Sequence, residues 1–80
     1  MALRARKPAL IVTFDTTTAA MAMERFCEEQ GLPGRLIPVP REITAGCGLA
    51  WMAPPDAEER LTRAGQAAGL IWSAMHRMEI

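Results

Sequence analysis

A continuous apolar stretch covers residues 9–14 and reads ALIVTF. An apolar run without alternation is typical of a strand that is covered on both faces, so we expect a central strand here. Asp15 and the threonines at 16–18 follow it, and their side-chain oxygens can cap the start of a helix. Apolar residues at helical spacing extend this helix through Gln30, and Gly31 is expected to end it in a left-handed conformation.

Three further strands are predicted downstream, separated by glycines and prolines. The first covers Arg35–Val39 and contains Pro38, which lacks the N–H group that a sheet ladder needs, so it should lie at an edge of the sheet. The next covers Gly48–Ala53, with Leu49 and Trp51 on one face. The last covers Leu70–Met78.

A second helix is predicted between the last two strands. Asp56 and Glu59 have the spacing of a capping box, and Gly69 is placed to end the helix. Gly65 inside it should cost about 1 kcal/mol relative to alanine. The face buried against the sheet is expected to consist of Ala57, Leu61, Ala64 and Ala68.

The element order β-α-β-β-α-β indicates an α+β fold of the ferredoxin-like kind, a two-layer sandwich. We expect a four-stranded antiparallel sheet in the order 4-1-3-2 with both helices on one face. Residues 9–80 form one domain in this interpretation, and residues 1–8 form a basic N-terminal arm. A different order of strands and helices is the main alternative.

The amino-acid composition excludes several classes of protein. The chain has 80 residues, half of them apolar, which favours a single folded domain over a disordered chain. Nine basic and nine acidic residues balance, which argues against a protein that binds nucleic acid by neutralising phosphates. The only long apolar stretch is too short for a secretory signal or a membrane span. We therefore expect a reduced, cytoplasmic protein with no membrane partner, and no cofactor is indicated.

One segment has the composition of a chemical site. Cys47 stands between Gly46 and Gly48, so its thiol is expected to be accessible, and nearby N–H groups could stabilise a thiolate. Arg41 could add positive charge if the loop folds back, whereas Glu42 opposes it. The alternative interpretation is a tight turn with a small filler residue.

The remaining candidate groups have simpler explanations. Cys27 lies on the inward stripe of the first helix, where free cysteine behaves as a small hydrophobic residue. His76 is the only histidine, and we expect it to be a surface or packing residue rather than a general base. Two cysteines and one histidine cannot alone supply the four ligands of a zinc site, so no metal is expected.

The chain resembles the selenium/sulfur carrier protein-like family, a group of small bacterial domains. The resemblance rests on residues 11–14, on Thr17, Ala20 and Glu24, and on the segment 38–48, which has the pattern P-x-P-R-x-[IL]-x-x-x-C-G. It covers roughly residues 9 to 70. Members often carry serines just before Gly-Cys-Gly, where this chain has Thr44 and Ala45.

The resemblance implies that Cys47 accepts sulfur or selenium as a persulfide or selenopersulfide and passes it to a partner protein. The implied donor is a cysteine desulfurase, and the acceptor is unknown. In this interpretation Arg41 attracts the anionic persulfide, Pro38 and Pro40 stiffen the base of the loop, and the protein is not an enzyme. Two alternatives stay open: a binding module that uses Leu49 and Trp51 on its sheet, and a thiol redox sensor at Cys47.

Overall fold

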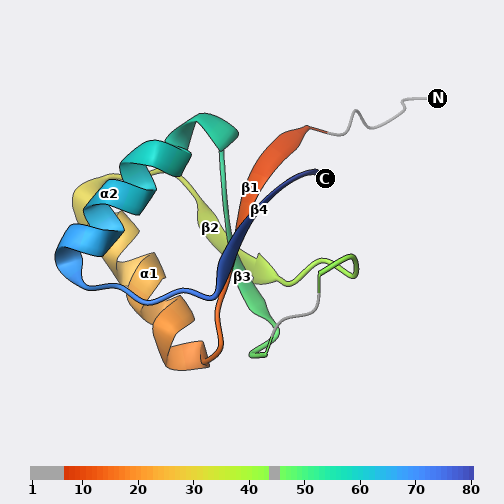
Figure 1. Ribbon diagram of the computed structural model, residues 1–80, viewed down its shortest axis with the longest axis horizontal. Helices are drawn as coiled ribbons and strands as arrows, with labels where there is room; N and C mark the ends of the chain where they lie inside the picture. The colour runs from red at the N-terminus through yellow and green to blue at the C-terminus, as the bar shows by residue number, and fades with distance from the viewer. Residues whose placement is uncertain (1–6, 44–45) are drawn as a thin grey trace.

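Two helices cover one face of a four-stranded antiparallel sheet in the computed structural model, which describes residues 7–43 and 46–80 (Figure 1). The strand order β2-β3-β1-β4 is the predicted 4-1-3-2 order, so the α+β prediction is confirmed. Most of the predicted arm, residues 1–6, and Thr44–Ala45 lie outside the described residues. The elements are β1 (Pro8–Thr13), α1 (Thr17–Gln30), β2 (Arg35–Pro38), β3 (Leu49–Ala53), the short 3₁₀ helix η1 (Pro55–Ala57), α2 (Glu58–Ala68) and β4 (Ala74–Glu79).

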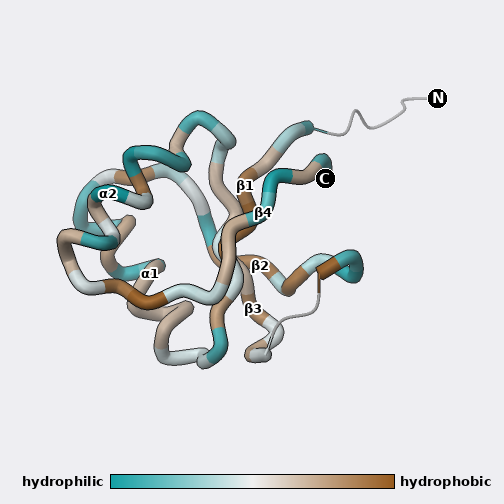
Figure 2. The backbone as a smooth tube through the Cα atoms, in the orientation of Figure 1, coloured by the Kyte–Doolittle hydropathy of each residue, from teal (hydrophilic) through white to brown (hydrophobic). Residues whose placement is uncertain are grey.

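The apolar run of β1 occupies the centre of the sheet, between β3 and β4. Alternate residues of a strand point to opposite faces, so Leu10 and Val12 face the helices whereas Ile11 faces away from them. All three side chains are fully buried. Figure 2 shows the strongly hydrophobic colour of β1 in the middle of the fold.

The ends of α1 follow the sequence prediction closely. The Thr16 side chain accepts a hydrogen bond from the Ala19 N–H at 3.1 Å, which caps the first turn. Gly31 has a φ of 69°, the left-handed conformation that ends many helices. The Leu32 N–H then donates to the Cys27 carbonyl at 2.9 Å, which completes a Schellman motif.

The start and the buried face of α2 differ from the prediction. Pro54 and Pro55 lead into the 3₁₀ turn of η1, and no side chain caps the helix at Ala57, so the predicted capping box of Asp56 and Glu59 is wrong. Ala68 is exposed, and Gly65 is buried in its place.

Gly65 makes room for a tryptophan. A Cβ atom at this position would lie 2.9 Å from the Trp72 ring, so the close approach of the ring depends on glycine. The helical cost predicted for Gly65 is thus offset by packing against a residue outside the helix.

Three strands are shorter than predicted, each at the end next to a loop. β2 ends at Pro38 rather than Val39, and β3 begins after Gly48. The last strand starts at Ala74 rather than Leu70, because the segment before it crosses from α2 back to the sheet. The Leu70 N–H closes the end of α2, and the Ser73 N–H donates to the Thr13 carbonyl at 2.7 Å.

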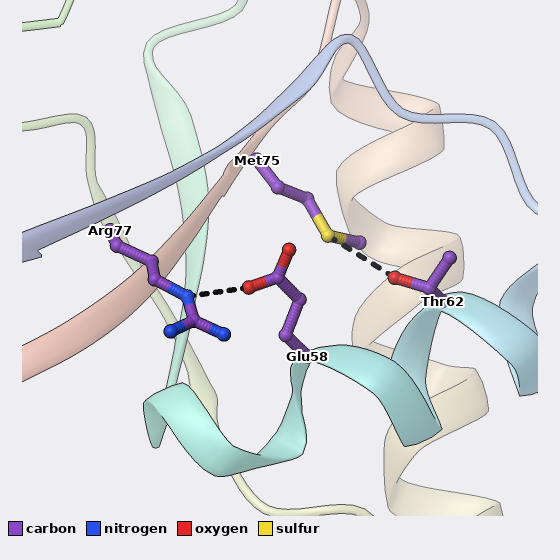
Figure 3. A network of polar contacts seen from close by, with 4 residues as sticks. All are labelled: Glu58, Thr62, Met75 and Arg77. Atoms are coloured by element: carbon purple, nitrogen blue, oxygen red, sulfur yellow. Dashed lines mark hydrogen bonds and ion pairs between the residues drawn. The ribbon is translucent and has the colours of Figure 1, made fainter.

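Side chains join α2 to the edge strand β4 (Figure 3). The Arg77 Nε–H donates to Glu58 Oε1 at 2.7 Å, and the Thr62 hydroxyl lies 3.5 Å from the Met75 sulfur. Arg77 and Met75 are two residues apart in β4, so their side chains point to the same face of the sheet. That face is the helix side, because their partners in β1 are Leu10 and Val12. This network fixes α2 over β4, while α1 covers β3 and β2.

Trp51 faces the helices and is only 3% exposed. Leu49 is partly buried on the same side. The predicted placement of the two residues on one face is therefore confirmed, but that face is the covered one. Trp51 is therefore covered by the helices and does not stand on the open face of the sheet.

Candidate functional site

The segment that joins β2 to β3 carries the candidate motif. The Val39 N–H donates to the Gly48 carbonyl at 3.0 Å, so the two strands stay paired just beyond their ends. A turn follows, closed by the Ile43 N–H donating to the Pro40 carbonyl at 3.0 Å. The tip of this turn is hydrophilic and projects away from the sheet (Figure 2).

The two ends of this connection pack against opposite faces of the sheet. Val39 and Ile43 contact the apolar cluster on the face without helices, around Ile11. Cys47 packs instead against the apolar core under the helices. The proline-rich part of the motif and its cysteine therefore belong to different sides of the molecule.

The Gly46–Gly48 segment lies beside the start of α1. A Cβ atom on Gly46 would lie 3.3 Å from the Asp15 carbonyl oxygen, so the two backbones are in close approach. Figure 1 shows this segment and the first turn of α1 at the same end of the sheet. Gly46, the residue before Cys47, therefore lies beside the segment that leads into α1, and this segment carries the acidic residue Asp15.

The Cys47 thiol is half-buried rather than fully accessible. Its sulfur lies 3.6 Å from the Leu49 carbonyl oxygen, to which the S–H group donates. This corrects the expectation that no neighbour covers the sulfur. In this position the sulfur is partly covered by the segment's own backbone.

Gly48, which follows Cys47, has a left-handed backbone conformation. Its φ is 78°, and no atom lies within 4 Å of a Cβ built there. The glycine is therefore required by the backbone conformation and not by crowding.

Cys27 differs from Cys47 in its burial. It is completely buried in α1, and its S–H donates to the Met23 sulfur at 3.7 Å. Burial raises the pKa of the Cys27 thiol to about 11, because removing the group from water disfavours the charged thiolate. The predicted packing role of this residue is confirmed. Both cysteines are free.

The predicted binding residues surround the connection without converging on the sulfur. Pro38 ends β2 and is exposed, Pro40 opens the turn, and Arg41 stands exposed at its tip. Within the described residues Arg41 has no ion-pair partner, so its guanidinium is free for an incoming molecule. The roles assigned to these three residues stay predictions.

His76 lies on the face without helices, directly opposite Ile11, and is half-buried. Within residues 7–43 and 46–80, no group of histidine, cysteine and acidic residues is arranged to hold a metal ion. In the same residues, no helix is long and apolar enough to cross a membrane.

The feature that sequence analysis missed is the close approach of Gly46, next to Cys47, to Asp15, just before α1. The threonines at 16–18 and the Gly-Cys-Gly segment are far apart in the chain, and their spacing carries no signal of contact. The resemblance already included Thr17 and Ala20 in the first turns of α1. The family pattern thus combines residues of the first turns of α1 with the cysteine motif, and this combination was the only sign in the sequence that the two segments belong together.

Comparison with curated proteins and with solved structures gives no significant match. The model of the family described as "Putative Se/S carrier protein-like" matches residues 9–77. This span takes in every helix and all four strands except the first residue of β1 and the last two residues of β4, and it includes the whole connection that carries Cys47. The chain belongs to this family.

Proposed function

We propose that this protein carries sulfur or selenium on Cys47, receiving it from a cysteine desulfurase-type donor and passing it to an acceptor protein. The observation that carries the proposal is the position of Cys47, which lies half-buried between two glycines in the connection from β2 to β3. The other cysteine is buried and its pKa is raised, so it is a poor nucleophile at neutral pH.

The loading step needs no outside oxidant. The Cys47 thiolate attacks the terminal sulfur of the donor's cysteine persulfide. The bond between the two donor sulfurs breaks, the donor cysteine leaves as a thiolate, and Cys47 becomes a persulfide. Delivery repeats the same exchange with a nucleophile of the acceptor. The oxidation level of the sulfur is unchanged, so the protein acts as a carrier and not as an enzyme.

The surroundings of Cys47 support a two-position cycle. In the observed position the thiol donates to the Leu49 carbonyl and is partly covered. Rotation about the flanking glycines would release the sulfur toward the partner, and backbone N–H groups of the segment would favour the anionic persulfide on its return. Arg41 would guide an anionic partner to the connection, while Pro38 and Pro40 hold its base. We place the protein in the cytoplasm, where thiols stay reduced.

Intact mass spectrometry with a cysteine desulfurase and L-cysteine tests the proposal. The wild-type protein and Cys27→Ala should each gain the mass of one sulfur atom, whereas Cys47→Ser should gain none. Loading that persists in Cys47→Ser would overturn the assignment. A protein that never loads sulfur or selenium but forms a mixed disulfide with oxidised glutathione would be a redox sensor instead.

A further inference from the structure

A small hollow lies between the C-terminal half of α1 and the start of β2. Its volume is about 280 Å³. Cys47 lies beside the other end of α1, so the hollow is separate from the sulfur site. The residues that line it are Glu24, Glu28, Leu32, Gly34, Arg35 and Trp51.

Three charged groups meet in this hollow without neutralising one another. Glu24 and Glu28 are one turn apart on α1, which places side chains next to each other on the helix surface. Arg35 stands across from them at the start of β2. Within residues 7–43 and 46–80 none of the three forms a salt bridge, so the hollow has two free carboxylates and one free guanidinium.

The floor of the hollow contains an unsatisfied donor. Trp51 is only 3% exposed, and its indole Nε1–H has no hydrogen-bond partner among the described residues. Burying such a group without an acceptor is costly. The Nε1 atom lies under Gly34, where a built Cβ would be only 2.5 Å away. Gly34 also lines the hollow, so the indole donor lies directly beneath the wall of the hollow, on the side of Arg35.

We propose that this hollow binds a free basic α-amino acid of the type of L-lysine. Its carboxylate pairs with Arg35 and supplies the acceptor that the Trp51 indole lacks. Its two ammonium groups pair with Glu24 and Glu28, and its aliphatic chain lies against the half-buried Leu32. Gly34 moves aside so that the carboxylate reaches the Trp51 indole. The charges of ligand and hollow then cancel completely. The proposal does not depend on the sulfur chemistry of Cys47.

A titration of the ¹⁵N-labelled protein with L-lysine, followed by NMR at constant ionic strength, tests it. The indole N–H signal of Trp51 should shift and saturate, with a Kd on the order of 1 mM for so small a ligand. Trp72 supplies an internal control because its ring packs on Gly65, outside the hollow. Equal shifts at both indoles, or a shift that never saturates, would overturn the proposal.

Two analogues separate the contacts. Norleucine lacks the terminal ammonium, and cadaverine lacks the carboxylate. Each should bind about tenfold more weakly than L-lysine, the loss expected for one charge-assisted hydrogen bond. Nα-acetyl-L-lysine amide should also bind weakly. If it binds as tightly as L-lysine, the hollow recognises a lysine side chain of a protein and the proposal is wrong.

Matched variants complete the test. Arg35→Gln should weaken the binding of L-lysine about tenfold. The binding of cadaverine should not be weakened, because cadaverine has no carboxylate that could pair with Arg35. Glu28→Gln should weaken both ligands. Glu29→Gln is the control, because Glu29 lies on the same helix but pairs with Arg25 and does not line the hollow. An equal loss in Glu29→Gln would show that only the general charge of α1 matters and would overturn the proposal.

Discussion

Cys27 and Cys47 differ in the way their surroundings are held in place. Around Cys27 the helix, the sheet and two tryptophans are packed so closely that two glycines, Gly34 and Gly65, have no room for a Cβ atom. Around Cys47 the chain turns at Gly48 with open space beside it. The same thiol group is therefore a packing element in the first region, whereas in the second it is half-buried and is the nucleophile that we propose. The difference comes from close packing and not from the cysteine itself.

Gly34→Ala should give the largest effect on the packed region. The new Cβ would lie 2.5 Å from Trp51 and 2.7 Å from the Met52 carbonyl, and a φ of 140° is unfavourable for alanine. We expect a loss of at least about 3 kcal/mol in the free energy of unfolding, measured by urea denaturation. A midpoint close to that of the wild type would show that the region is looser than described.

The buried thiol should make stability depend on pH at the alkaline end. The pKa of Cys27 is raised in the folded state, so its contribution is complete below pH 9 and is lost as the pH rises toward about 11. Between about pH 8 and about pH 10.5 the free energy of unfolding should fall by about 2 kcal/mol through this group.

Cys27→Ala is the control for this pH dependence. The variant should be less stable at neutral pH because packing is lost, but its profile should be flatter. Few other groups titrate in this alkaline range, because the chain has no tyrosine and Lys7 is its only lysine. Parallel profiles for the variant and the wild type would contradict the raised pKa.

Gly48→Ala is the matched change in the open region. Alanine meets no neighbour there, so only the left-handed backbone conformation opposes it. We expect a loss of about 1 kcal/mol, well below that of Gly34→Ala, in the same urea experiment. Equal losses in the two alanine variants would erase the distinction between the regions.

Cys47→Ser should have the smallest effect on stability. The side chain is half-buried, and a serine hydroxyl can also donate to the Leu49 carbonyl. We expect a change within about 0.5 kcal/mol, measured by thermal or urea unfolding. A loss as large as that of Cys27→Ala would assign Cys47 to the core.

Local signals explain why much of the fold could be predicted from the sequence. The apolar run of β1, the Thr16 cap and the glycines at 31 and 69 act over a few residues, and all lie where the pattern indicates. Pro38 in turn identified β2 as an edge strand.

The errors arose where distant residues decide the structure. Gly65 is buried because Trp72, beyond the end of α2, packs against it, and no periodicity within the helix shows this. The partial burial of Cys47 depends on the core under the helices and on the Leu49 carbonyl. Its position beside Asp15 depends on strand pairing across the sheet, which the sequence of the motif alone does not specify.

Peptide-resolved mass spectrometry of the wild-type protein tests the central claim most directly, because both cysteines are present in one molecule. After a brief native reaction with a cysteine desulfurase and L-cysteine, the persulfides are trapped by alkylation and located by peptide mapping. The account predicts a persulfide on the Cys47 peptide and an unmodified Cys27 peptide. Persulfide on Cys27, or equal amounts on both cysteines, would contradict it.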